Sequence, residues 1–520
     1  MTVALVGELG NRKWWALGAV FLTILCVGVD STVLSVALPT LAKSLHASES
    51  ELQWFSSGYL LVLAATMLPA GLLGDRYGHK KVFLFSLALF GLGSLACGYS
   101  KTVSEFMAAR VILGLAGAGV IVMAISSLTV LFSQEERPKA VGILGAGNFL
   151  AFPIGPILGG WLLTNYWWGW VFLINVPIVV IGFVAAAMLL PEFEAQERPG
   201  IDLMGIVLSV VGLVAVIYGL IKTGEDGWSS PIALAAVFAG IVILVVFFWW
   251  ERRLTSSPGG QPLLDVTLFH SQSFTWGAIL AAISSLPLIG VLFTMPQYFQ
   301  GVLGTTAMGS GVRLLPLIAG VLAGALPASR VARSLGSKVT VAAGFATLAL
   351  GLCVGAATSP GSSEFFVAAW LTVVGAGLGL VLTTATSAAL VELTPEKSGT
   401  GSAALEAIDE IGSPLGAAIL GSVVSSGYLA RLGLTGLSIS AAVAARQSVF
   451  GGVAIANELH SASILANVRS AFAHGVDEAL LVSAVIAVLS CVLTLVFLPR
   501  SNPSAQMEHT KEVKSAPRSA

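Results

Sequence analysis

The sequence predicts an all-α polytopic membrane protein, and three observations carry this prediction. Of the 520 residues, 56% are hydrophobic and only 10% are charged, whereas a soluble domain is typically about a quarter charged. The mean hydropathy is +0.90. Apolar runs of about 20 residues, the length that crosses a bilayer as a helix, recur along the chain. The weaker alternation that is typical of a membrane β-barrel, about ten residues per strand, does not occur.

Fourteen candidate membrane-spanning helices follow one another along the chain. Their starts are placed near Trp14, Leu52, Val82, Ser104, Pro138, Trp167, Asp202, Pro231, Phe274, Met308, Val339, Glu364, Lys397 and Val476. The run 14–41 is too long for the apolar part of a signal peptide and has no small-residue cleavage site before Lys43, so we interpret it as the first span. The segment 425–475 mixes Gly and Ser with an interrupted apolar stretch, and we expect a short helical hairpin there.

Basic residues are distributed unevenly over the predicted loops. With the N-terminus inside, 18 of the 26 Lys and Arg residues lie on the inner side and six on the outer side, while Arg110 and Arg313 lie within spans. Loops rich in Lys and Arg stay in the cytoplasm, so both termini are expected there. A net charge of -1 argues against nucleic acid as a partner. The six His and four Cys show no metal-ligand spacing, so no metal site is expected.

A loop with a distinctive pattern follows the second predicted span. It reads GLLGDRYGHKK, from Gly71 to Lys81. Its glycines allow close helix approach, and the adjacent Asp and Arg can form a latch that breaks when two domains move apart. The structural alternative is an ordinary basic cytoplasmic loop. The residues assigned to conformational gating are Gly71, Gly74, Asp75, Arg76, Gly78, Lys80 and Lys81.

The fourth and fifth predicted spans carry two further features. Arg110 lies about one turn inside the fourth span, where an unpaired guanidinium costs at least about 2.5 kcal/mol, so it requires an acidic or carbonyl partner. The fifth span contains GPILGG, whose glycines permit tight packing and whose proline bends the helix. The residues assigned to this fifth-span motif are Gly142, Gly155, Pro156, Gly159 and Gly160.

In the order of these motifs, the sequence resembles the major facilitator superfamily and its fourteen-helix drug:proton antiporter branch, over nearly the whole chain. GLLGDRYGHKK is similar to the signature of the loop between helices 2 and 3, and Arg110 with Gly114 is similar to the basic motif of the fourth helix. Gly142 with GPILGG looks like the antiporter motif, which the resemblance associates with exporters. The segments 29–39 and 262–269 look like further signatures of the branch.

The chain departs from the family pattern at several positions. Ala151 and Leu113 stand where the motifs usually have Gly and Gln, and the second-half copy of the loop signature, 328–338, lacks its Asp. Some quaternary-ammonium exporters of this branch carry an acid three residues after the second-helix Trp. Here Ser57 occupies that place after Trp54, which argues against a preference for dications.

The resemblance implies a major facilitator fold with two six-helix bundles, residues 1–190 and 273–498. Residues 191–272 would form a linker with two extra transmembrane helices, residues 425–475 an extracellular loop, and residues 499–520 a cytoplasmic tail. Substrate would bind between the bundles near the middle of the membrane. The expected protein is a monomer in the lipid bilayer of a bacterial cell membrane, with small-molecule drugs as substrates, no cofactor, and protons as the coupling ion.

Four carboxylates are predicted to lie within the membrane and to act in proton coupling and substrate binding. Asp30 is about 16 residues into the first span, or about 24 Å at helical rise. On the thirteenth span, Glu406 and Glu410 share one face, and Asp409 lies beside them. Intramembrane acids are rare, and neighbouring like charges favour the protonated form. Our hypothesis is that these acids exchange protons for a cationic substrate. The resemblance implies that Asp30 and Arg110 belong to the proton path.

The predicted function is therefore a proton-coupled efflux antiporter that exports lipophilic, cationic drugs or antiseptics by alternating access, and not an enzyme. Three alternatives remain open. Asp409 and Glu410 could instead pair structurally with Arg110 or Arg313. The substrate could be a single antibiotic or metabolite. The chain could be a non-transporting receptor on a carrier fold. A primary ATP-driven pump is excluded because the sequence has no G-x-x-x-x-G-K-[ST] loop.

Overall fold

The structure, a computed structural model, describes residues 12–132, 136–191, 202–257, 260, 262–391, 398–435 and 437–499. Within these ranges every regular element is helical, and thirteen helices are long and apolar enough to cross a membrane. Helix α6 (Arg137–Asn165) is the fourteenth helix of spanning length. The predicted helix start at Lys397, residues 192–201, 258, 259 and 261 of the predicted linker, and the tail from 500 onward lie outside the described residues.

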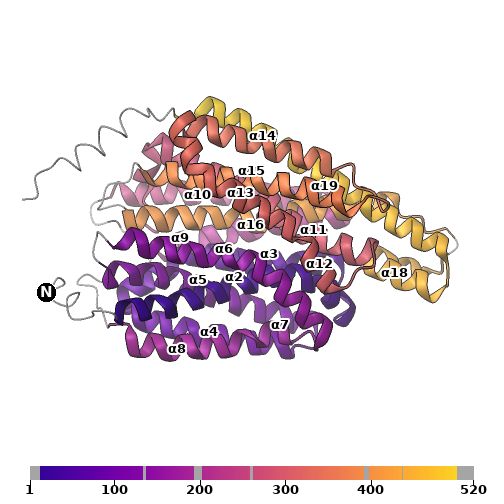
Figure 1. The fold of residues 1–520 in the computed structure, drawn as a ribbon, viewed down its shortest axis with the longest axis horizontal. Helices are drawn as coiled ribbons and strands as arrows, with labels where there is room; N and C mark the ends of the chain where they lie inside the picture. The colour runs from indigo at the N-terminus through magenta and orange to yellow at the C-terminus, as the bar shows by residue number, and fades with distance from the viewer. Residues whose placement is uncertain are drawn as a thin grey trace, which may run out of the picture.

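The first six spans form an N-terminal group, coloured indigo to magenta in Figure 1. Helix α2 packs on α6 and α8, α3 packs on α5, and α4 packs on both α5 and α8. Helix α3 begins at a capping box, in which Ser48 and Glu51 satisfy each other's backbone donors. The helices of this group are α2 (Arg12–Ser44), α3 (Glu49–Tyr77), α4 (His79–Tyr99), α5 (Val103–Leu131), α6, α7 (Trp170–Leu173) and α8 (Asn175–Leu189).

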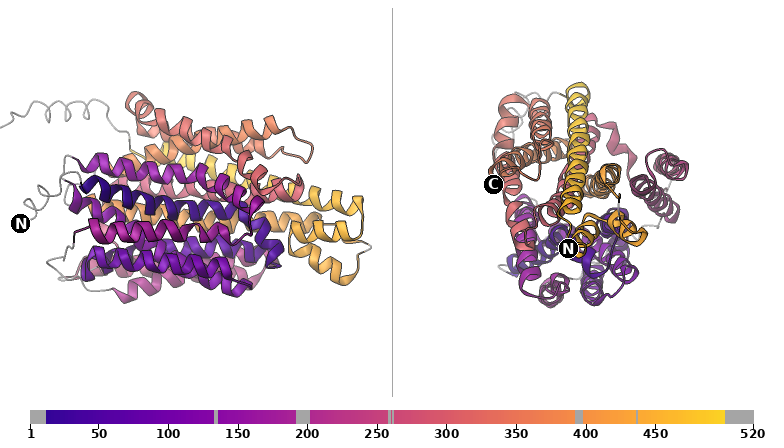
Figure 2. Two further views of the ribbon diagram at one scale, coloured as in Figure 1. Left: turned by 60° about the horizontal axis from the view of Figure 1, so that its bottom comes forward. Right: turned by 90° about the vertical axis from the view of Figure 1, so that its right-hand side faces the viewer.

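Two helices, α9 (Leu203–Asp226) and α10 (Pro231–Thr255), pack mainly on each other. Helix α9 also contacts α3 and α16, and the pair lies to one side of the other helices in the right-hand view of Figure 2. Large apolar side chains of α10 are exposed, among them Phe238 at 70% and Val245 at 62%. Such exposure is unfavourable in water and is what a lipid-facing helix requires.

The remaining spans form a C-terminal group, coloured from red through orange to yellow and drawn mostly in the upper half of Figure 1. In this group α13 and α14 pack on α15, α11 packs on α16, and α19 packs on α14 and α16. Its elements are η1 (Val266–His270), α11 (Gln272–Gln297), η2 (Tyr298–Val302), α12 (Ala307–Arg313), α13 (Leu315–Leu335), α14 (Ser337–Gly355), α15 (Glu364–Val391), α16 (Ser398–Arg431), α17 (Ile439–Gln447), α18 (Val449–Glu458) and α19 (Ala462–Phe497).

The region 425–475 was predicted as an extracellular loop with a short helical hairpin, and most of it is helical. Helix α16 continues to Arg431, α17 and α18 form the short helical pair, and α19 begins at Ala462 rather than near Val476. These segments project at one end of the molecule, on the right in Figure 1. We call this the hairpin end, and we call the opposite end, where α2 begins and α19 ends, the termini end.

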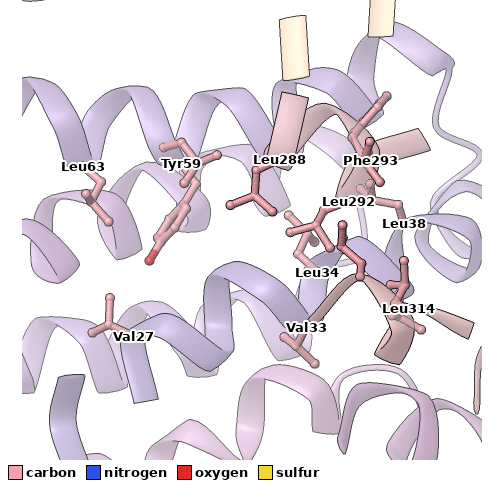
Figure 3. Packing of buried hydrophobic residues seen from close by; sticks show 14 of the residues in the cluster. Val27, Val33, Leu34, Leu38, Tyr59, Leu63, Leu288, Leu292, Phe293 and Leu314 are labelled. Carbon is pink, nitrogen blue, oxygen red and sulfur yellow. The ribbon is translucent and has the colours of Figure 1, made fainter. Parts of the chain in front are cut away.

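The two groups of helices contact each other at the hairpin end. Leu34 and Leu38 of α2 lie in one buried cluster with Leu292 and Phe293 of α11, as Figure 3 shows. Polar contacts add to this apolar seam, because the side-chain amide of Gln300 donates to the backbone carbonyl of Val36 at 3.1 Å. The ammonium of Lys43 lies 5.6 Å from the ring centroid of Phe450. The structure therefore has its hairpin end closed between the groups.

Candidate functional site

Asp30 and Arg110 form a buried ion pair inside the N-terminal group. Asp30 lies on α2 and Arg110 on α5, and Nη1 of the arginine donates to Oδ2 of the aspartate at 2.8 Å. Their side chains are 0% and 2% exposed. Nε of Arg110 also donates to the backbone carbonyl of Phe55 at 3.2 Å. Arg110 thus has both an acidic and a carbonyl partner, as its depth in the span requires.

Asn175 and Tyr59 complete this buried pair. Nδ2 of Asn175, at the start of α8, donates to the second oxygen of Asp30 at 2.9 Å. The ring of Tyr59 lies 3.9 Å from the guanidinium carbon of Arg110, a cation–π contact, and its hydroxyl is 3.3 Å from that of Ser31. Neither residue was singled out from the sequence. The available signal was weak, since Asn175 is one amide inside the apolar run WVFLINVP and Tyr59 is one aromatic residue among many.

Helix α16, which carries the other three predicted acids, lies between the two groups of helices. It packs on α11 and α19 of its own group and on α3 and α9 on the opposite side. Small residues make this close contact possible. A Cβ on Gly416 would lie 2.8 Å from Cα of Leu286 in α11, and a Cβ on Gly421 would lie 2.7 Å from Cγ of Gln53 in α3. A side chain on α16 is therefore close to both groups of helices.

Glu406, Asp409 and Glu410 are half-buried on α16. Asp409 accepts a hydrogen bond from the hydroxyl of Ser285 in α11 at 2.8 Å, and Ser285 was not anticipated from the sequence. The charges of Glu406 and Asp409 both act on Glu410. Within the described residues, neither glutamate has an ion-pair or hydrogen-bond partner. A carboxylate so placed lacks a protein counter-charge and can accept one from a proton or a cation.

The two arginines that could have neutralised these acids are engaged elsewhere. Arg110 pairs with Asp30, and Arg313 of α12 pairs with Glu364 at the start of α15. The structural alternative, in which Asp409 or Glu410 pairs with one of these arginines, is not the arrangement found.

Tyr59 contacts the buried ion pair, and its helix packs against α16. Its hydroxyl lies in the electrostatic fields of Asp30, Arg110 and Glu410. The side chain is fully buried on α3, the helix that packs against α16. The structure therefore does not place Asp30 beside the α16 acids in one cluster. It places two clusters with Tyr59 in contact with the first and in the field of the second.

The predicted gating loop joins α3 to α4 at the termini end. Asp75 contacts Nε2 of His79 at 2.8 Å, so the partner of this aspartate in the structure is His79 rather than Arg76. Gly78 has φ +99°, a conformation that side chains rarely adopt. A Cβ on Gly74 would lie 2.6 Å from Sδ of Met123 in α5, so this glycine permits a tight contact. Gly71 lies one turn earlier in α3, and Lys80 and Lys81 lie in the first turn of α4.

The predicted antiporter motif lies on α6 and faces two neighbours. Gly155 and Gly159 pack so closely on α2 that an added Cβ would clash with Thr32 and Val33. A Cβ on Gly160 would lie 2.7 Å from Cα of Met308 in α12, which belongs to the other group. Likewise, a Cβ on Gly311 of α12 would clash with the carbonyl of Pro156. Gly142 lies nearer the start of α6. The end of this motif is therefore part of the closed hairpin end.

An apolar pocket lies in the C-terminal group between α11, α13 and α15. It is lined by Leu288, Leu292, Leu317, Ile318, Val321, Leu322 and Leu382. Leu288 and Leu292 also appear beside the α2 side chains in Figure 3, so the pocket adjoins the seam between the groups. Its wall is aliphatic. Across the ranges given above, no cluster of three His, Cys, Asp or Glu residues could hold a metal ion.

Comparison with known proteins places the chain among transporters. The family model described as Major Facilitator Superfamily matches residues 20–202 and 200–417. The tetracenomycin C resistance and export protein of Streptomyces glaucescens is 30% identical over 508 residues, which cover 95% of this chain and 93% of that protein. The methyl viologen resistance protein SmvA of Salmonella typhimurium is 31% identical, with coverage of 89% and 93%. The multidrug efflux pump LfrA of Mycolicibacterium smegmatis is 29% identical, with coverage of 93% and 96%.

Solved structures share the fold. A bacterial homolog of the human lysosomal transporter Spinster, in an inward-facing and unoccupied conformation, superposes with a TM-score of 0.67 and 16% identity. The match covers 95% of this chain and 99% of that one. The occupied, inward-facing form of the same homolog gives a TM-score of 0.66. At this identity the likeness concerns the arrangement of the helices.

Proposed function

The chain belongs to the Major Facilitator Superfamily, and from this premise we propose that it exports lipophilic cationic drugs or antiseptics in exchange for protons. The observation that carries the proposal is the set of α16 carboxylates, which lie where the two groups of helices meet and lack a basic partner among the described residues. Its relatives that are named for resistance, export or multidrug efflux support the direction and kind of transport.

In the proposed cycle, the compound enters a cavity open at the termini end. Its charge is balanced by ionised Glu406 or Glu410, and its apolar part packs on aliphatic walls such as the pocket that includes Leu288. The groups then rock about the α3–α16 contact and open the hairpin end. Protons neutralise the glutamates, the compound leaves, and the carrier returns. Each proton that moves inward down a potential of 100 mV supplies about 2.3 kcal/mol.

Three further assignments belong to this proposal. The termini end faces the cytoplasm, in keeping with the excess of Lys and Arg in the predicted inner loops. The protein works as a monomer in a bacterial cell membrane, as expected of a carrier whose two bundles lie in one chain. Asp30 and Arg110 contribute to the proton path by setting the field around Tyr59, and the loop of Asp75 gates the termini end.

The test is transport in proteoliposomes with an imposed proton gradient, scored with a fluorescent monocation. Glu406→Gln and Glu410→Gln should each reduce gradient-driven uptake at least tenfold, because an amide cannot exchange a proton. Glu364→Gln is the matched control, since Glu364 is a surface carboxylate paired with Arg313. Gradient-driven transport that survives in both variants would refute the proposal.

A second candidate substrate is a single antibiotic or metabolite, which the full-length similarity to the tetracenomycin C resistance and export protein favours. A substrate panel of monocations, dications and neutral polyaromatic compounds in the same proteoliposomes separates the two. Broad transport of monocations supports the multidrug proposal. Transport confined to one neutral scaffold supports the dedicated exporter. In either case we expect weak transport of dications, because Ser57 stands where some quaternary-ammonium exporters of this branch have an acid.

A further inference from the structure

Glu49 and Gln297 form a second buried polar pair, separate from the two clusters described above. Glu49 is the first residue of α3, and Gln297 is the last residue of α11. The pair therefore joins the N-terminal group to the C-terminal group at the hairpin end. Glu49 is 6% exposed and Gln297 is 0% exposed. Nε2 of Gln297 donates to Oε1 of Glu49 at 3.2 Å and also to the backbone carbonyl of Phe293 at 3.2 Å.

Each member of the pair has one oxygen without a donor. Across the described part of the chain, Oε2 of Glu49 and Oε1 of Gln297 are buried and have no hydrogen-bond partner. An ionised carboxylate that is buried with one neutral donor is strongly disfavoured, because water would otherwise supply several hydrogen bonds. A proton on Oε2 removes the charge and converts an unpaired acceptor into a donor. The carbonyl oxygen of Gln297 is likewise buried and unpaired, so apart from Nε2 of Gln297 no described donor compensates a negative charge at this pair.

The charged and titratable groups at this end do not neutralise Glu49. Lys222 of α9 pairs with Asp226 at 3.3 Å, and Asp477 of α19, which acts on Tyr298, is itself an acid. The ammonium of Lys43, at the end of α2, lies over the ring of Phe450. Glu51 on α3 caps the start of its own helix. Tyr428 on α16 lies in the field of Glu49, but its hydroxyl donates to a backbone carbonyl of α17 at 2.7 Å. In the ranges that the structure covers, no cation lies within ion-pair distance of the Glu49 carboxylate, so a proton is the counter-charge that remains.

We propose that Glu49 is a proton-binding site of the hairpin-end gate, protonated while the two groups are in contact there and ionised when they separate. Separation gives the carboxylate the water that its ionised form needs, and closure removes that water. The proposal rests on the proposed proton-coupled export and adds to it a proton site remote from α16. With the hairpin end outside, external protons reach Glu49 as soon as the gate opens, and protonation then favours closure.

The sign of the effect follows from linkage. Because the closed gate binds the proton more tightly than the open gate does, acid shifts the population toward closure and alkali shifts it toward opening. A single linked proton changes the closed-to-open ratio by at most tenfold per pH unit. This response needs neither substrate nor a membrane gradient.

The experiment measures the width of the hairpin end directly. Nitroxide labels on Tyr99→Cys, at the end of α4, and Phe365→Cys, at the start of α15, report the distance between the groups by pulsed electron resonance. Both positions are exposed, at 64% and 84%. The full-length chain is reconstituted in lipid nanodiscs at pH 5.5, 7.0 and 8.5 without substrate. The native cysteines to be replaced by Ala are Cys26, Cys97, Cys353 and Cys491.

The parent protein should shift from the short to the long distance as the pH rises. Glu49→Gln should hold the short distance at every pH, because the amide mimics the protonated acid. Glu51→Gln is the matched control, one carboxylate in the same first turn, and should keep the pH response. Gln297→Leu is a second variant that should also keep a pH response, at a displaced midpoint, because the proton resides on Glu49.

Two outcomes overturn the proposal. One is a pH response of the parent that Glu49→Gln leaves unchanged, which would make Glu49 a structural residue. The other is a gate that follows sodium concentration at constant pH, which would make the pair a cation site. The distance measurement can fail or succeed separately from the transport assay. If Glu406→Gln and Glu410→Gln retain coupled transport while Glu49 still controls the distance, the assignment of coupling to the α16 glutamates fails and the gate site stands.

Discussion

The buried pair of Asp30 and Arg110 provides the clearest quantitative prediction. Asp30→Asn keeps the volume of the side chain and removes its charge. The guanidinium of Arg110, 2% exposed, then loses its counter-charge and keeps only neutral partners, among them the carbonyl of Phe55 and the ring of Tyr59. Removing one member of a buried ion pair costs about 3–5 kcal/mol. The remaining cation–π contact already exists in the parent and cannot offset this loss. We therefore expect a loss of about 3 kcal/mol or more in the free energy of unfolding.

The assay is reversible unfolding in mixed detergent micelles, followed by tryptophan fluorescence. Asp30→Asn combined with Arg110→Gln gives the matched double variant, in which no charge is left unpaired. Its loss of stability should be well below the sum of the two single losses, with a coupling energy of about 1 kcal/mol or more. Glu364→Gln breaks an Arg–carboxylate pair of the same chemistry at the surface and should cost about 1 kcal/mol or less.

Two results would refute this reasoning. The first is a loss below about 1 kcal/mol for Asp30→Asn, which would mean that water reaches the pair. The second is additivity of the two single losses, which would mean that Asp30 and Arg110 do not stabilise each other.

Two further predictions concern the gates. Gly160→Val should keep the hairpin end from closing, because its side chain would meet the backbone at Met308, and the label distance described above should then stay long. Gly18→Val, at a position with no atom within 4 Å of the added Cβ, is the control, and a short distance in the first variant would contradict the packing argument. Asp75→Asn should change the free energy of unfolding by less than about 1 kcal/mol, because its contact with His79 is exposed, yet should slow transport in proteoliposomes. Unchanged transport would remove the gating role.

The fold could be predicted largely from the sequence because each span is a long apolar run of the length that a bilayer requires. The boundaries outside the bilayer were harder. Helix α19 begins at Ala462, well before the predicted start at Val476. The mixture of Gly and Ser with an interrupted apolar stretch in 425–475 indicates a loop up to that point. Polar residues alone do not end a helix, so a membrane-spanning helix can extend beyond the apolar run that the sequence shows. The break at Ile174 between α7 and α8 was not predicted either, because the apolar pattern runs through it.

The charged residues of the candidate site could be predicted from the sequence, whereas its neutral residues could not. Buried charges are so costly that Asp30 and Arg110 stand out in any apolar run. Their neutral partner Asn175 does not, because one amide in a span is common, and its role depends on a helix 145 positions away in the chain. The same holds for Ser285, which donates to Asp409 across a helix pair. Hydrogen bonds between distant helices are a property of the packing rather than of local sequence.

The Asp30–Arg110 cluster and the acids of α16 differ in how their charges are compensated, and this difference suits them to different roles. Asp30 has both oxygens engaged, by Arg110 and Asn175, so its charge is balanced within the N-terminal group and the cluster is held in one arrangement. Glu406 and Glu410 have no such partners among the described residues, so their charge must be balanced by something that arrives and leaves. A rigid cluster whose charges are balanced can provide a constant electrostatic field at Tyr59. A cluster whose charges are not balanced can bind a proton or a cation. The proposed exchange between a proton and a cation requires the second kind of cluster, and the acids of α16 form such a cluster at the contact between the two groups.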